Sequence, residues 1–385
     1  MKILQVHNSY LNEGGEDQVV RAEAEALRGA GDEVVEARMA NPSRFGSQSA
    51  NLAFAPWNPK SARWMASVVE RHEPDLAHVH NTWYRLTPSV ITALKRRSVP
   101  VVMTVHNYRM VCANALFFRD GGPCTDCLGR QPWRSVAYRC YRGSAAQSLM
   151  AAGTIAINRS MNTWEDGVDR FVVSTRFVED KLVEAGFPRD RMRLVPSIVP
   201  DAGPREQPPS ASSSVVYVGR LDEGKGLEAV FEAWSRVPAP LELLVVGDGP
   251  LRASLESLAV PRVRMVGWKE RPEVDRIMRT SRAMVFPSAF FETLGMSLAE
   301  ALAAGLPVVA GSVGTRPEVL GNNGAGWLID PAQPDAWEVA LRALADDDAV
   351  DRAGVAARQR YDSDFAPAVA LPRLQAVFRE VAAGA

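Results

Sequence analysis

Several features are scarce or absent in this sequence of 385 residues, and each absence excludes a class of protein. It contains no run of about 18 apolar residues, so we expect neither a membrane-spanning helix nor a signal peptide. Only four cysteines are present, which excludes a disulfide-stabilised scaffold, and we expect a cytoplasmic protein with reduced thiols. The net charge of -1 lacks the positive field typical of nucleic-acid-binding proteins, so nucleic acid is not an expected partner.

The composition is that of an ordinary globular protein, with 46% apolar and 23% charged residues. At about 100–200 residues per domain, the length allows two domains. In the first half, short apolar runs alternate with amphipathic segments, which predicts parallel βαβ units with helices on both faces of a sheet. The expected strands are residues 3–7, 33–37, 75–81, 100–106, 171–173 and 193–195, and the expected helices are 16–28, 62–71, 88–97 and 176–185.

This alternation stops at residues 196–214, where five prolines and five serines are typical of a linker. Further strands are expected at 215–218, 241–246, 263–266, 283–286 and 307–310. The sequence therefore predicts two doubly wound, Rossmann-like α/β domains, residues 1–200 and 201–365, joined by a proline-rich hinge. Because ligands of open parallel sheets bind outside the carboxyl ends of the strands, we expect the site in the cleft between these domains.

A glycine-rich loop follows the first strand of the second domain, from Gly219 to Gly226. Its three glycines let the backbone approach an anion. Arg220 and Lys225 place two cations on one turn, as binding of a diphosphate requires. A surface turn with solvated charges is the alternative, since short glycine-rich motifs often arise by chance.

A second segment, residues 287–301, carries Glu292 and Glu300 eight positions apart. We expect a helix to begin near Thr293, with Glu292 just outside it and Glu300 two turns inside, too far apart to share one proton or metal ion. Carboxylates accept hydrogen bonds from hydroxyls, so the pair suits two parts of an elongated ligand such as a nucleotide sugar. A phosphate would bind at the helix start, at the backbone N–H groups of Leu294, Gly295 and Met296.

The alternative is that Glu292 caps the helix and Glu300 is solvated. The apolar neighbours of Glu300 disfavour it, because an unpaired charge there would be costly. Three of the five histidines, His7, His80 and His106, follow or end predicted strands, at the sheet edge where ligands bind. A single histidine there is usually structural, but three converging ones favour a site.

With these motifs in order, the chain resembles the retaining glycosyltransferases of the GT-B fold, specifically family four, which includes sucrose synthase-like and mannosyltransferase-like enzymes. The resemblance covers almost the whole chain, and its most specific parts are residues 219–226, 246–250, 292–300, 305–310, 314 and 317–319. It implies that Arg220 and Lys225 bind the donor diphosphate, while Glu292 contacts sugar hydroxyls and Glu300 the ribose. The donor site would be completed by Gly219, Leu294, Gly295 and Met296.

In the first domain, His106 matches the position that reaches the donor sugar in this family. Gly14-Gly15-Glu16 resembles its Gly-Gly-x-Glu loop at the donor phosphate and acceptor. We assign Gly15 to the donor, and Gly14, Glu16 and His80 to the acceptor. The resemblance further implies that the last helix, residues 366–385, crosses back onto the first domain.

The implied reaction is transfer of a hexose or related sugar with retention of configuration, by front-face attack on the donor. The catalytic residues would be His106, Glu292, Arg220 and Lys225, with the two cations stabilising the departing diphosphate. No cofactor or metal ion is then required for catalysis. The acidic run 346–348 is interpreted as a solvated face late in an alanine-rich helix.

All four cysteines lie in a segment of the first domain, residues 107–142, that resembles a cysteine-bearing subset of the family. Their C-x11-C-x2-C-x12-C spacing is compatible with a structural tetrahedral zinc site, and four unrelated thiols are the alternative. The zinc ligands would be Cys112, Cys124, Cys127 and Cys140.

Residues 81–142 carry ten basic and two acidic residues, interleaved with aromatics. Two interpretations remain open: an anionic, lipid-linked acceptor with peripheral contact at the inner face of the membrane, or a solvated arginine-rich face. The acceptor is a sugar, lipid-linked or small-molecule hydroxyl. The donor is expected to be a UDP-sugar, with GDP-mannose as the alternative.

Rival functions are a nucleotide-sugar epimerase or hydrolase of the same fold and a non-catalytic sugar-nucleotide-binding protein. An NAD-linked oxidoreductase is disfavoured, because no G-x-G-x-x-G motif follows the first strand.

Overall fold

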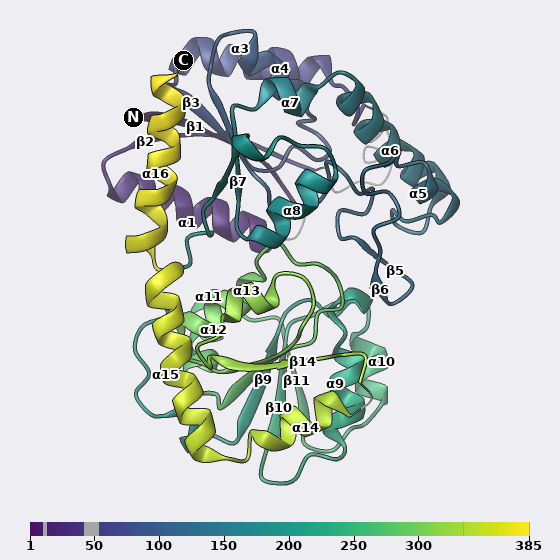
Figure 1. Ribbon diagram of the computed structural model, residues 1–385, viewed down its shortest axis with the longest axis vertical. Coiled ribbons are helices and arrows are strands. Elements are labelled where there is room, and N and C mark those ends of the chain that lie inside the picture. Colours follow the sequence, from purple (N-terminus) through teal and green to yellow (C-terminus); the bar gives the residue numbers. More distant parts are fainter. Residues whose placement is uncertain (11–13, 42–53, 334, 385) are drawn as a thin grey trace. The chain divides into compact units, whose positions relative to one another are not determined.

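The computed structural model describes residues 1–10, 14–41, 54–333 and 335–384. The chain divides into two compact units, shown in Figure 1. Unit 1 comprises residues 1–117, 124–198 and those from Ala370 on, and unit 2 comprises residues 118–123 and 199–369. The short hairpin of β5 (Phe118–Arg119) and β6 (Gly122–Pro123), within the predicted cysteine segment, therefore groups with unit 2.

Unit 1 is built on a parallel sheet in the order β2-β1-β3-β4-β7-β8. Its strands are β1 (Lys2–Ser9), β2 (Glu33–Ala40), β3 (Leu76–Val79), β4 (Val101–Thr104), β7 (Arg170–Val173) and β8 (Met192–Leu194). Its helices are α1 (Gly15–Gly29), α3 (Pro59–His72), α4 (Ser89–Lys95), α5 (Arg134–Ala137), α6 (Ala145–Ser160), α7 (Thr163–Gly167), α8 (Arg176–Glu184) and α16 (Pro367–Ala383). All four residues of β3 and all four of β4, the two central strands, are buried. This is the pattern of a sheet covered on both faces.

The last helix belongs to the core of unit 1. Leu374 and Phe378 of α16 pack with Ile3, Leu76 and Val102, which lie on three different strands. Figure 1 shows this helix beside the sheet of unit 1, close to the first residue of the chain. Both ends of the chain therefore contribute to one hydrophobic core.

Unit 2 has a second parallel sheet, in the order β11-β10-β9-β12-β13-β14. Its strands are β9 (Ser214–Val218), β10 (Glu242–Val246), β11 (Val263–Gly267), β12 (Ala283–Phe286), β13 (Val308–Gly311) and β14 (Gly326–Ile329). Its helices are α9 (Leu227–Trp234), α10 (Arg252–Ser257), α11 (Arg271–Thr280), α12 (Met296–Ala303), α13 (Arg316–Leu320), α14 (Ala336–Ala343) and α15 (Asp347–Asp364). Two six-stranded parallel sheets confirm the predicted class of two Rossmann-like α/β domains.

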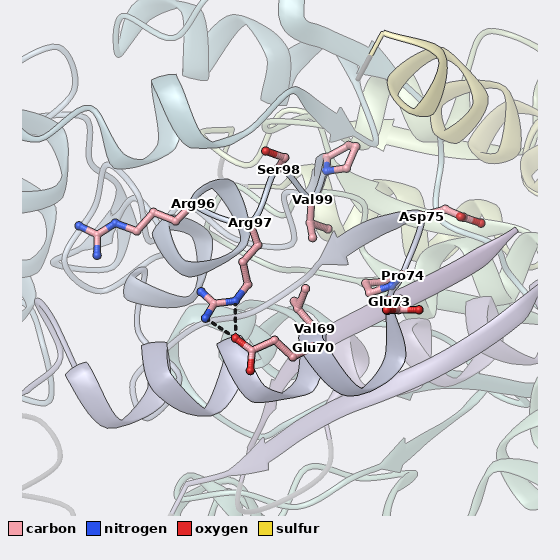
Figure 2. Close-up of a pocket in the computed structure, with 10 residues that line it drawn as sticks. Val69, Glu70, Glu73, Pro74, Asp75, Arg96, Arg97, Ser98 and Val99 are labelled. Carbon is pink, nitrogen blue, oxygen red and sulfur yellow. Dashed lines mark hydrogen bonds and ion pairs between the residues drawn. The ribbon is translucent and has the colours of Figure 1, made fainter.

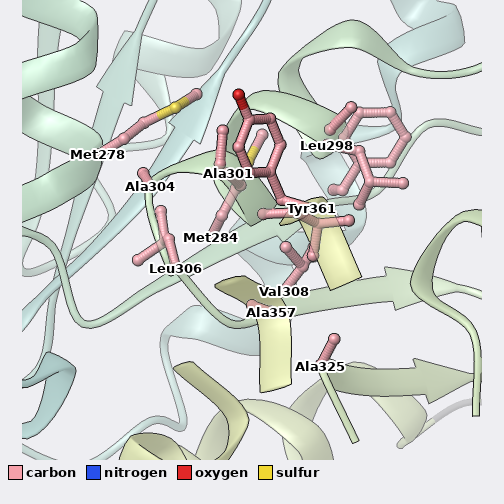
Figure 3. Close-up of a cluster of buried hydrophobic side chains, with 14 of the residues drawn as sticks. Met278, Met284, Leu298, Ala301, Ala304, Leu306, Val308, Ala325, Ala357 and Tyr361 are labelled. Atoms are coloured by element: carbon pink, nitrogen blue, oxygen red, sulfur yellow. The ribbon is translucent and has the colours of Figure 1, made fainter. Parts of the chain in front are cut away.

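Alternate residues of the unit 2 strands enter two different cores, as period-two strand geometry requires. Val216 and Met284 pack on the face covered by α11, α12 and α15, whereas Val215 and Val285 pack on the face of α9 and α14. Figure 3 shows the first of these cores, where Tyr361 of α15 lies among side chains of α12 and the strands. This packing holds α12, and with it Glu300, against the sheet.

The predicted linker is anchored on α15 at two points. Tyr361 Oη donates to Val199 O at 3.0 Å, and Ser210 binds Asp351 through both its backbone N–H and its hydroxyl, at 2.8 and 2.7 Å. The interpretation of residues 196–214 as a plain linker is therefore wrong for the part after Ile198, because its polar groups find partners on this helix.

The acidic run 346–348 is also placed differently from the interpretation given above. Asp346 precedes α15 and its side chain accepts from the Ala349 backbone N–H at 3.0 Å, the role of an N-cap. Asp347 pairs with the buried Arg282. The run begins a helix rather than ending one.

Candidate functional site

The first strand of unit 1 leads into a polar cluster at the start of α1. Gly14 precedes the helix, and its backbone N–H donates to Asp17 Oδ2 at 3.0 Å. The other oxygen of Asp17 lies 2.9 Å from His7 Nε2, and both side chains are buried. Burial raises the pKa of Asp17, but the hydrogen bonds from His7 and Gly14 outweigh it, so the pKa is lowered. This network fixes Gly14 at the start of α1.

Glu16 joins α1 to the segment that follows β4. Its Oε1 accepts from Asn107 Nδ2 at 2.6 Å. Burial raises the pKa of Glu16, and the hydrogen bonds from Asn107 and Tyr10 only partly oppose this rise. A carboxyl group with a raised pKa can hold or release a proton nearer neutral pH, a common property of groups in active sites. Gly15 is exposed at the first position of the same helix.

Four histidines gather at the carboxyl ends of β1, β3 and β4: His7, His78, His80 and His106. His80 Nδ1 lies 2.8 Å from His106 Nε2, and the two rings stack with their centroids 5.1 Å apart. Burial lowers the pKa of both rings, that of His106 to about 3, so both are neutral at physiological pH. A neutral imidazole offers one hydrogen-bond donor and one acceptor.

A narrow cavity of about 30 Å³ opens beside this pair of histidines. It has room for about one water molecule. The guanidinium of Arg109 is placed here, with Cζ 4.6 Å from the Trp83 ring centroid and 4.9 Å from that of Tyr141. Other residues of its lining are Asn81, Pro88, Met103, Asn107, Thr154 and Trp164.

A larger hollow of about 710 Å³ lies at the opposite edge of the same sheet. Figure 2 shows its lining, in which Arg97 donates two hydrogen bonds to Glu70. The hollow adjoins residues 73–75 and 96–100, which precede β3 and β4. Ligands of parallel sheets bind at the carboxyl ends of the strands, so this amino-end hollow is not the candidate site.

In unit 2, the loops after β9 and β10 lie against each other. Gly247 has φ +137°, and a Cβ there would come within 1.9 Å of Gly219 O. The backbone N–H of Leu221 donates to Asp248 O at 3.0 Å, and Gly249 leaves no room for a Cβ beside Leu221. Glycines at 219, 247 and 249 therefore let two loops meet at the carboxyl edge of this sheet.

Lys225 and Glu292, 67 positions apart in the sequence, form an ion pair at that edge, with Nζ 2.8 Å from Oε1. Ser288 Oγ donates to the same oxygen at 2.8 Å, and Lys225 Nζ lies 4.8 Å from the Phe290 ring centroid. Both charged side chains are partly exposed. The side chain of Arg220 is 75% exposed, 3.4 Å from Asp222. Of the predicted donor-site residues Arg220, Lys225 and Glu292, the structure thus brings Lys225 and Glu292 together and leaves Arg220 facing solvent.

Glu300 is only 5% exposed on α12, where Arg271 binds Oε1. Arg271 Nε also pairs with Asp275 at 2.7 Å. Burial raises the pKa of Glu300, and the charge of Arg271 opposes this rise. The helix begins at Met296 after Gly295, which has φ +82°. Glu300 therefore lies about one turn inside the helix, so the expectation of two turns is wrong, because the glycine delays the helix start.

Sequence reasoning missed several residues that support these groups. Arg271 gave no signal, because an arginine at the start of an amphipathic helix is ordinarily solvated. Arg316 is fully buried, and donates to Gly311 O at 2.7 Å and to Phe290 O at 3.1 Å, which fixes the loop before α12. The Arg-Pro dipeptide at 316–317 marks a helix start, and only the fold reveals its contacts.

The four cysteines are reduced and half-buried in this structure. Burial raises the pKa of Cys112, opposed by backbone hydrogen bonds from Phe117, Asn114 and Ala115. In the part of the chain that the structure describes, no three cysteine sulfurs lie within 4.8 Å of one another. The predicted tetrahedral site is therefore not gathered here, and zinc binding stays a prediction.

Two parallel Rossmann-like sheets, each with charged and glycine-rich loops at its carboxyl edge, define the GT-B class of α/β proteins. One family model, glycosyl transferase 4-like domain, matches residues 14–197, and another, glycosyl transferases group 1, matches residues 212–347. Both matches are to glycosyltransferase families, one in each half of the chain.

Among its relatives, the sulfoquinovosyl transferase SQD2 of Arabidopsis thaliana is 28% identical over 314 residues, which is 77% of this chain and 55% of that protein. The chain thus spans little more than half of that relative. The D-rhamnosyltransferase WbpZ of Pseudomonas aeruginosa is 24% identical over 363 residues, 89% of this chain and 86% of its own.

Solved structures share the fold over the full length of both chains. Sucrose-phosphate synthase from Thermosynechococcus elongatus has a TM-score of 0.69 at 21% identity, and Anabaena HepE in complex with UDP and glucose has 0.68 at 15%.

Proposed function

We propose that this protein is a retaining glycosyltransferase that moves a hexose or related sugar from a nucleotide-sugar donor, with UDP favoured, to a hydroxyl acceptor. The observation that carries the proposal is the constellation at the carboxyl edge of unit 2: the Lys225–Glu292 pair and the buried Glu300 on α12. The matches of residues 14–197 and 212–347 to glycosyltransferase family models support it. So do the UDP and glucose held by the structural relative HepE.

In unit 2, Lys225 and Arg220 bind the donor diphosphate. Backbone N–H groups of Leu294 and Gly295, which precede α12, and of Met296, its first residue, assist them. The first N–H groups of a helix lack partners within it, which suits Met296 to this role. Glu292 accepts from sugar hydroxyls and Glu300 from the ribose, and Gly219 allows the backbone to approach. Binding of the diphosphate draws Lys225 partly away from Glu292, which frees that carboxylate for the sugar.

In unit 1, His106 is neutral and hydrogen-bonds to the donor sugar, with its orientation set by His80 at 2.8 Å. Gly15 approaches the donor phosphate. Gly14 and Glu16 bind the acceptor, and the raised pKa of Glu16 suits a carboxyl group that exchanges a hydrogen bond with a hydroxyl. His80 is buried, with Nδ1 on His106 and Nε2 facing Glu23, so it acts on the acceptor site only by positioning His106.

The reaction needs no covalent enzyme intermediate. The acceptor oxygen forms a bond to the anomeric carbon on the face from which the diphosphate leaves, and the acceptor proton passes to the departing phosphate oxygen. Arg220 and Lys225 stabilise the negative charge that develops on that oxygen, a role that metal ions fill in other transferases. Attack on the face from which the diphosphate leaves retains the configuration of the sugar. The two cations take the place of a metal ion in the proposed reaction.

A thermal-shift series with UDP, GDP, TDP and their sugars tests the donor site. We expect UDP and a UDP-sugar to raise the melting temperature of the protein and to have little effect on Glu300→Ala. If no nucleotide stabilises the protein, the transferase proposal fails. Proton NMR of the product then tests retention, since an inverted anomeric signal would contradict the mechanism.

The epimerase or hydrolase alternative makes a different prediction. Such an enzyme consumes a UDP-sugar at a substantial rate without an acceptor, whereas a transferase does so only slowly. A non-catalytic binding protein would bind the nucleotide but would not consume the UDP-sugar, whether or not an acceptor is present.

For the cysteine segment, we propose a structural zinc ion held by Cys112, Cys124, Cys127 and Cys140. The backbone hydrogen bonds to Cys112, and the electrostatic effect of Cys112 and Cys124 on Cys127, support this proposal. The four thiolates would close the site and leave no position for catalysis. Metal analysis of Cys124→Ser and Cys127→Ser, each purified without chelator, tests it, since zinc content equal to wild type contradicts the proposal.

We also propose that unit 1 contacts an anionic lipid surface, from which a lipid-linked acceptor is reached. Residues 127–164 contain no acidic residue, and the exposed arginines there are Arg130, Arg134, Arg139 and Arg142. Large exposed apolar side chains share this face: Trp133, Tyr138, Leu149, Ile157 and Met161. They lie on and beside α5 and α6, which pack against each other (Figure 1). Cations interleaved with aromatic and aliphatic side chains are typical of membrane-surface binding.

None of the described helices is long and apolar enough to cross a membrane. Sedimentation with vesicles of phosphatidylglycerol and phosphatidylcholine tests the contact. We expect binding only to the anionic vesicles, and a loss of roughly 30-fold in Arg134→Gln/Arg139→Gln, at about 1 kcal/mol per arginine. Leu149→Gln should also weaken binding. Val355→Gln, which changes an even more exposed apolar residue in unit 2, should not. Equal binding to neutral vesicles would contradict the proposal.

A further inference from the structure

Three buried side chains with metal-binding atoms converge inside unit 1, one from α1 and two from β3 and the residue after it. Glu23 lies on the buried stripe of α1, between Val20 and Leu27, where an apolar residue is expected. His78 is in β3 and His80 directly follows it. The exposed fractions of the three residues are 2%, 0% and 3%. Glu23 Oε2 lies 3.5 Å from His78 Nδ1 and 3.6 Å from His80 Nε2, and all three atoms are within 4.8 Å of one another.

These three atoms make no hydrogen bond within the described part of the chain. The two distances exceed those of a hydrogen bond, and each unsatisfied buried polar atom costs about 1–3 kcal/mol. A protein core does not ordinarily retain such a group of atoms without something to bind.

The far nitrogens of both rings are already engaged. His78 Nε2 lies 2.7 Å from Thr104 Oγ1, and His80 Nδ1 lies 2.8 Å from His106 Nε2. When these nitrogens carry the ring protons, His78 Nδ1 and His80 Nε2 present lone pairs to the Glu23 carboxyl group. A proton on Glu23 would satisfy one lone pair and leave the other without a donor. A cation would satisfy all three atoms at once.

We propose that Glu23, His78 and His80 bind a divalent transition-metal ion, with zinc as the best match to two imidazole nitrogens and one carboxylate oxygen. Ligands bound tetrahedrally at about 2.0–2.2 Å are roughly 3.3–3.6 Å apart, which agrees with the two contacts of Glu23. Thr104 and His106 would orient the two rings, as the outer partners of metal-binding histidines do.

The ion would join α1 to the carboxyl end of β3. Through His80 it would also fix the ring of His106, so its role is structural and it takes part in no step of transfer. The site differs from the proposed cysteine site in its ligand chemistry, because it has nitrogen and oxygen ligands and no sulfur. The inference does not depend on the proposed reaction.

Metal analysis of protein purified without chelator tests the site, with three chains compared: wild type, Glu23→Gln and Glu25→Gln. Glu25 is exposed on the same helix and is the matched control. We expect Glu23→Gln to contain one metal ion per chain fewer than the other two. Equal metal content in all three would overturn the proposal.

A second measurement covers the case in which Glu23→Gln fails to fold. The double variant Cys124→Ser/Cys127→Ser, prepared with cobalt as the only transition metal, retains the proposed histidine site and loses two thiolates. We expect one cobalt ion per chain, with visible bands of nitrogen and oxygen ligands and no thiolate charge-transfer band. Only traces of bound cobalt, or a spectrum dominated by thiolate, would overturn the proposal.

Discussion

At the residue scale, the charged groups of unit 2 have partners that are distant in the sequence. Lys225 is held by Glu292, and Glu300 is held by Arg271 in the space beneath α12. Each carboxylate is thereby neutralised while no ligand is bound, which lowers the cost of burying it. Lys225 is then available to an incoming diphosphate. These pairs are consistent with a site prepared for a ligand that carries both phosphates and hydroxyls.

Lys225→Met removes the cation that binds Glu292 Oε1, an oxygen that also accepts from Ser288. We expect the Kd for UDP to rise about tenfold to a hundredfold, because a hydrogen bond to a charged group contributes about 1.5–3 kcal/mol. Isothermal titration calorimetry measures this. Lys181→Met, at a surface ion pair with Glu184 in unit 1, is the control and should bind UDP as wild type does. Unchanged affinity in Lys225→Met would remove this lysine from the donor site.

The types of residue in the candidate site could be predicted from the sequence, but their partners could not. Glu300 stands among apolar residues, which indicated that its charge must be compensated, yet nothing local identified Arg271, 29 positions earlier, as the group that does so. Likewise Glu23 occupies an apolar position of α1, a signal that passes unnoticed until the fold places two histidines beside it. Partners across a sheet depend on topology, which residue spacing does not contain.

At the element scale, the start of α12 depends on Gly295. Its φ of +82° is the left-handed region, and a Cβ there would lie 2.9 Å from Phe286 Cζ. Gly324 has nearly the same φ, +81°, with open space around it, and so provides a matched control. We expect Gly324→Ala to lower the free energy of unfolding by about 1–2 kcal/mol, the backbone cost alone.

Gly295→Ala should cost more than this control, because the ring of Phe286 must also move, and it should weaken UDP binding by displacing the helix start. Urea denaturation and calorimetry measure the two effects. If both alanine variants lose equal stability and bind UDP equally well, the contact with Phe286 has no role in placing α12.

The helix α16 is held on unit 1 by a carboxylate between two arginines. Glu380 accepts from Arg193 at 2.9 Å and from Arg170 at 2.7 Å, and these contacts lower its pKa. A carboxyl group whose pKa is lowered by folding stabilises the folded protein at pH values above its unfolded pKa of about 4.3. That contribution is lost as the pH falls through the pKa of the folded state.

Glu380→Gln should therefore reduce the free energy of unfolding at neutral pH by about 1 kcal/mol or less, since the pair is partly exposed. The difference from wild type should begin to shrink below about pH 4.3 and disappear once the pH is below the lowered pKa of Glu380 in the folded protein. Chemical denaturation across this pH range measures it. A difference that persists in acid would assign the effect to packing of the side chain rather than to its charge.

Strands were predictable where apolar runs are long, and the last strand of unit 2 was not. β14 (Gly326–Ile329) has four residues, begins with glycine and follows a glycine-rich turn, so no period-two pattern develops. The glycine is required there, because a Cβ on Gly326 would come within 2.0 Å of Val308 O on the neighbouring strand.

The acidic run 346–348 lies at the start of a helix and not late in one, as the sequence suggested. Acidic residues are common both in the first turn of a helix and on a solvated helix face, so their presence alone does not distinguish the two positions.

At the scale of the whole molecule, the two units differ in how the chain builds them. Unit 2 is nearly continuous, and both of its cores lie within residues 199–365. The core of unit 1 requires α16, which is synthesised last: Phe378 packs against strands near the start of the chain, with its ring centroid 5.0 Å from that of His78. Unit 1 can therefore complete its core only after unit 2 has been made.

This difference predicts the behaviour of two fragments. Residues 199–369 should unfold cooperatively in urea and bind UDP, because they retain both hydrophobic cores and the Lys225, Glu292 and Glu300 constellation. Residues 1–198 should show no cooperative transition and should bind a hydrophobic dye, since their sheet lacks Leu374 and Phe378 and exposes Ile3 and Val102. Co-expression of residues 367–385 should restore a transition. A fragment 1–198 that unfolds with the same midpoint as unit 1 of the full chain would show that α16 is dispensable for this core.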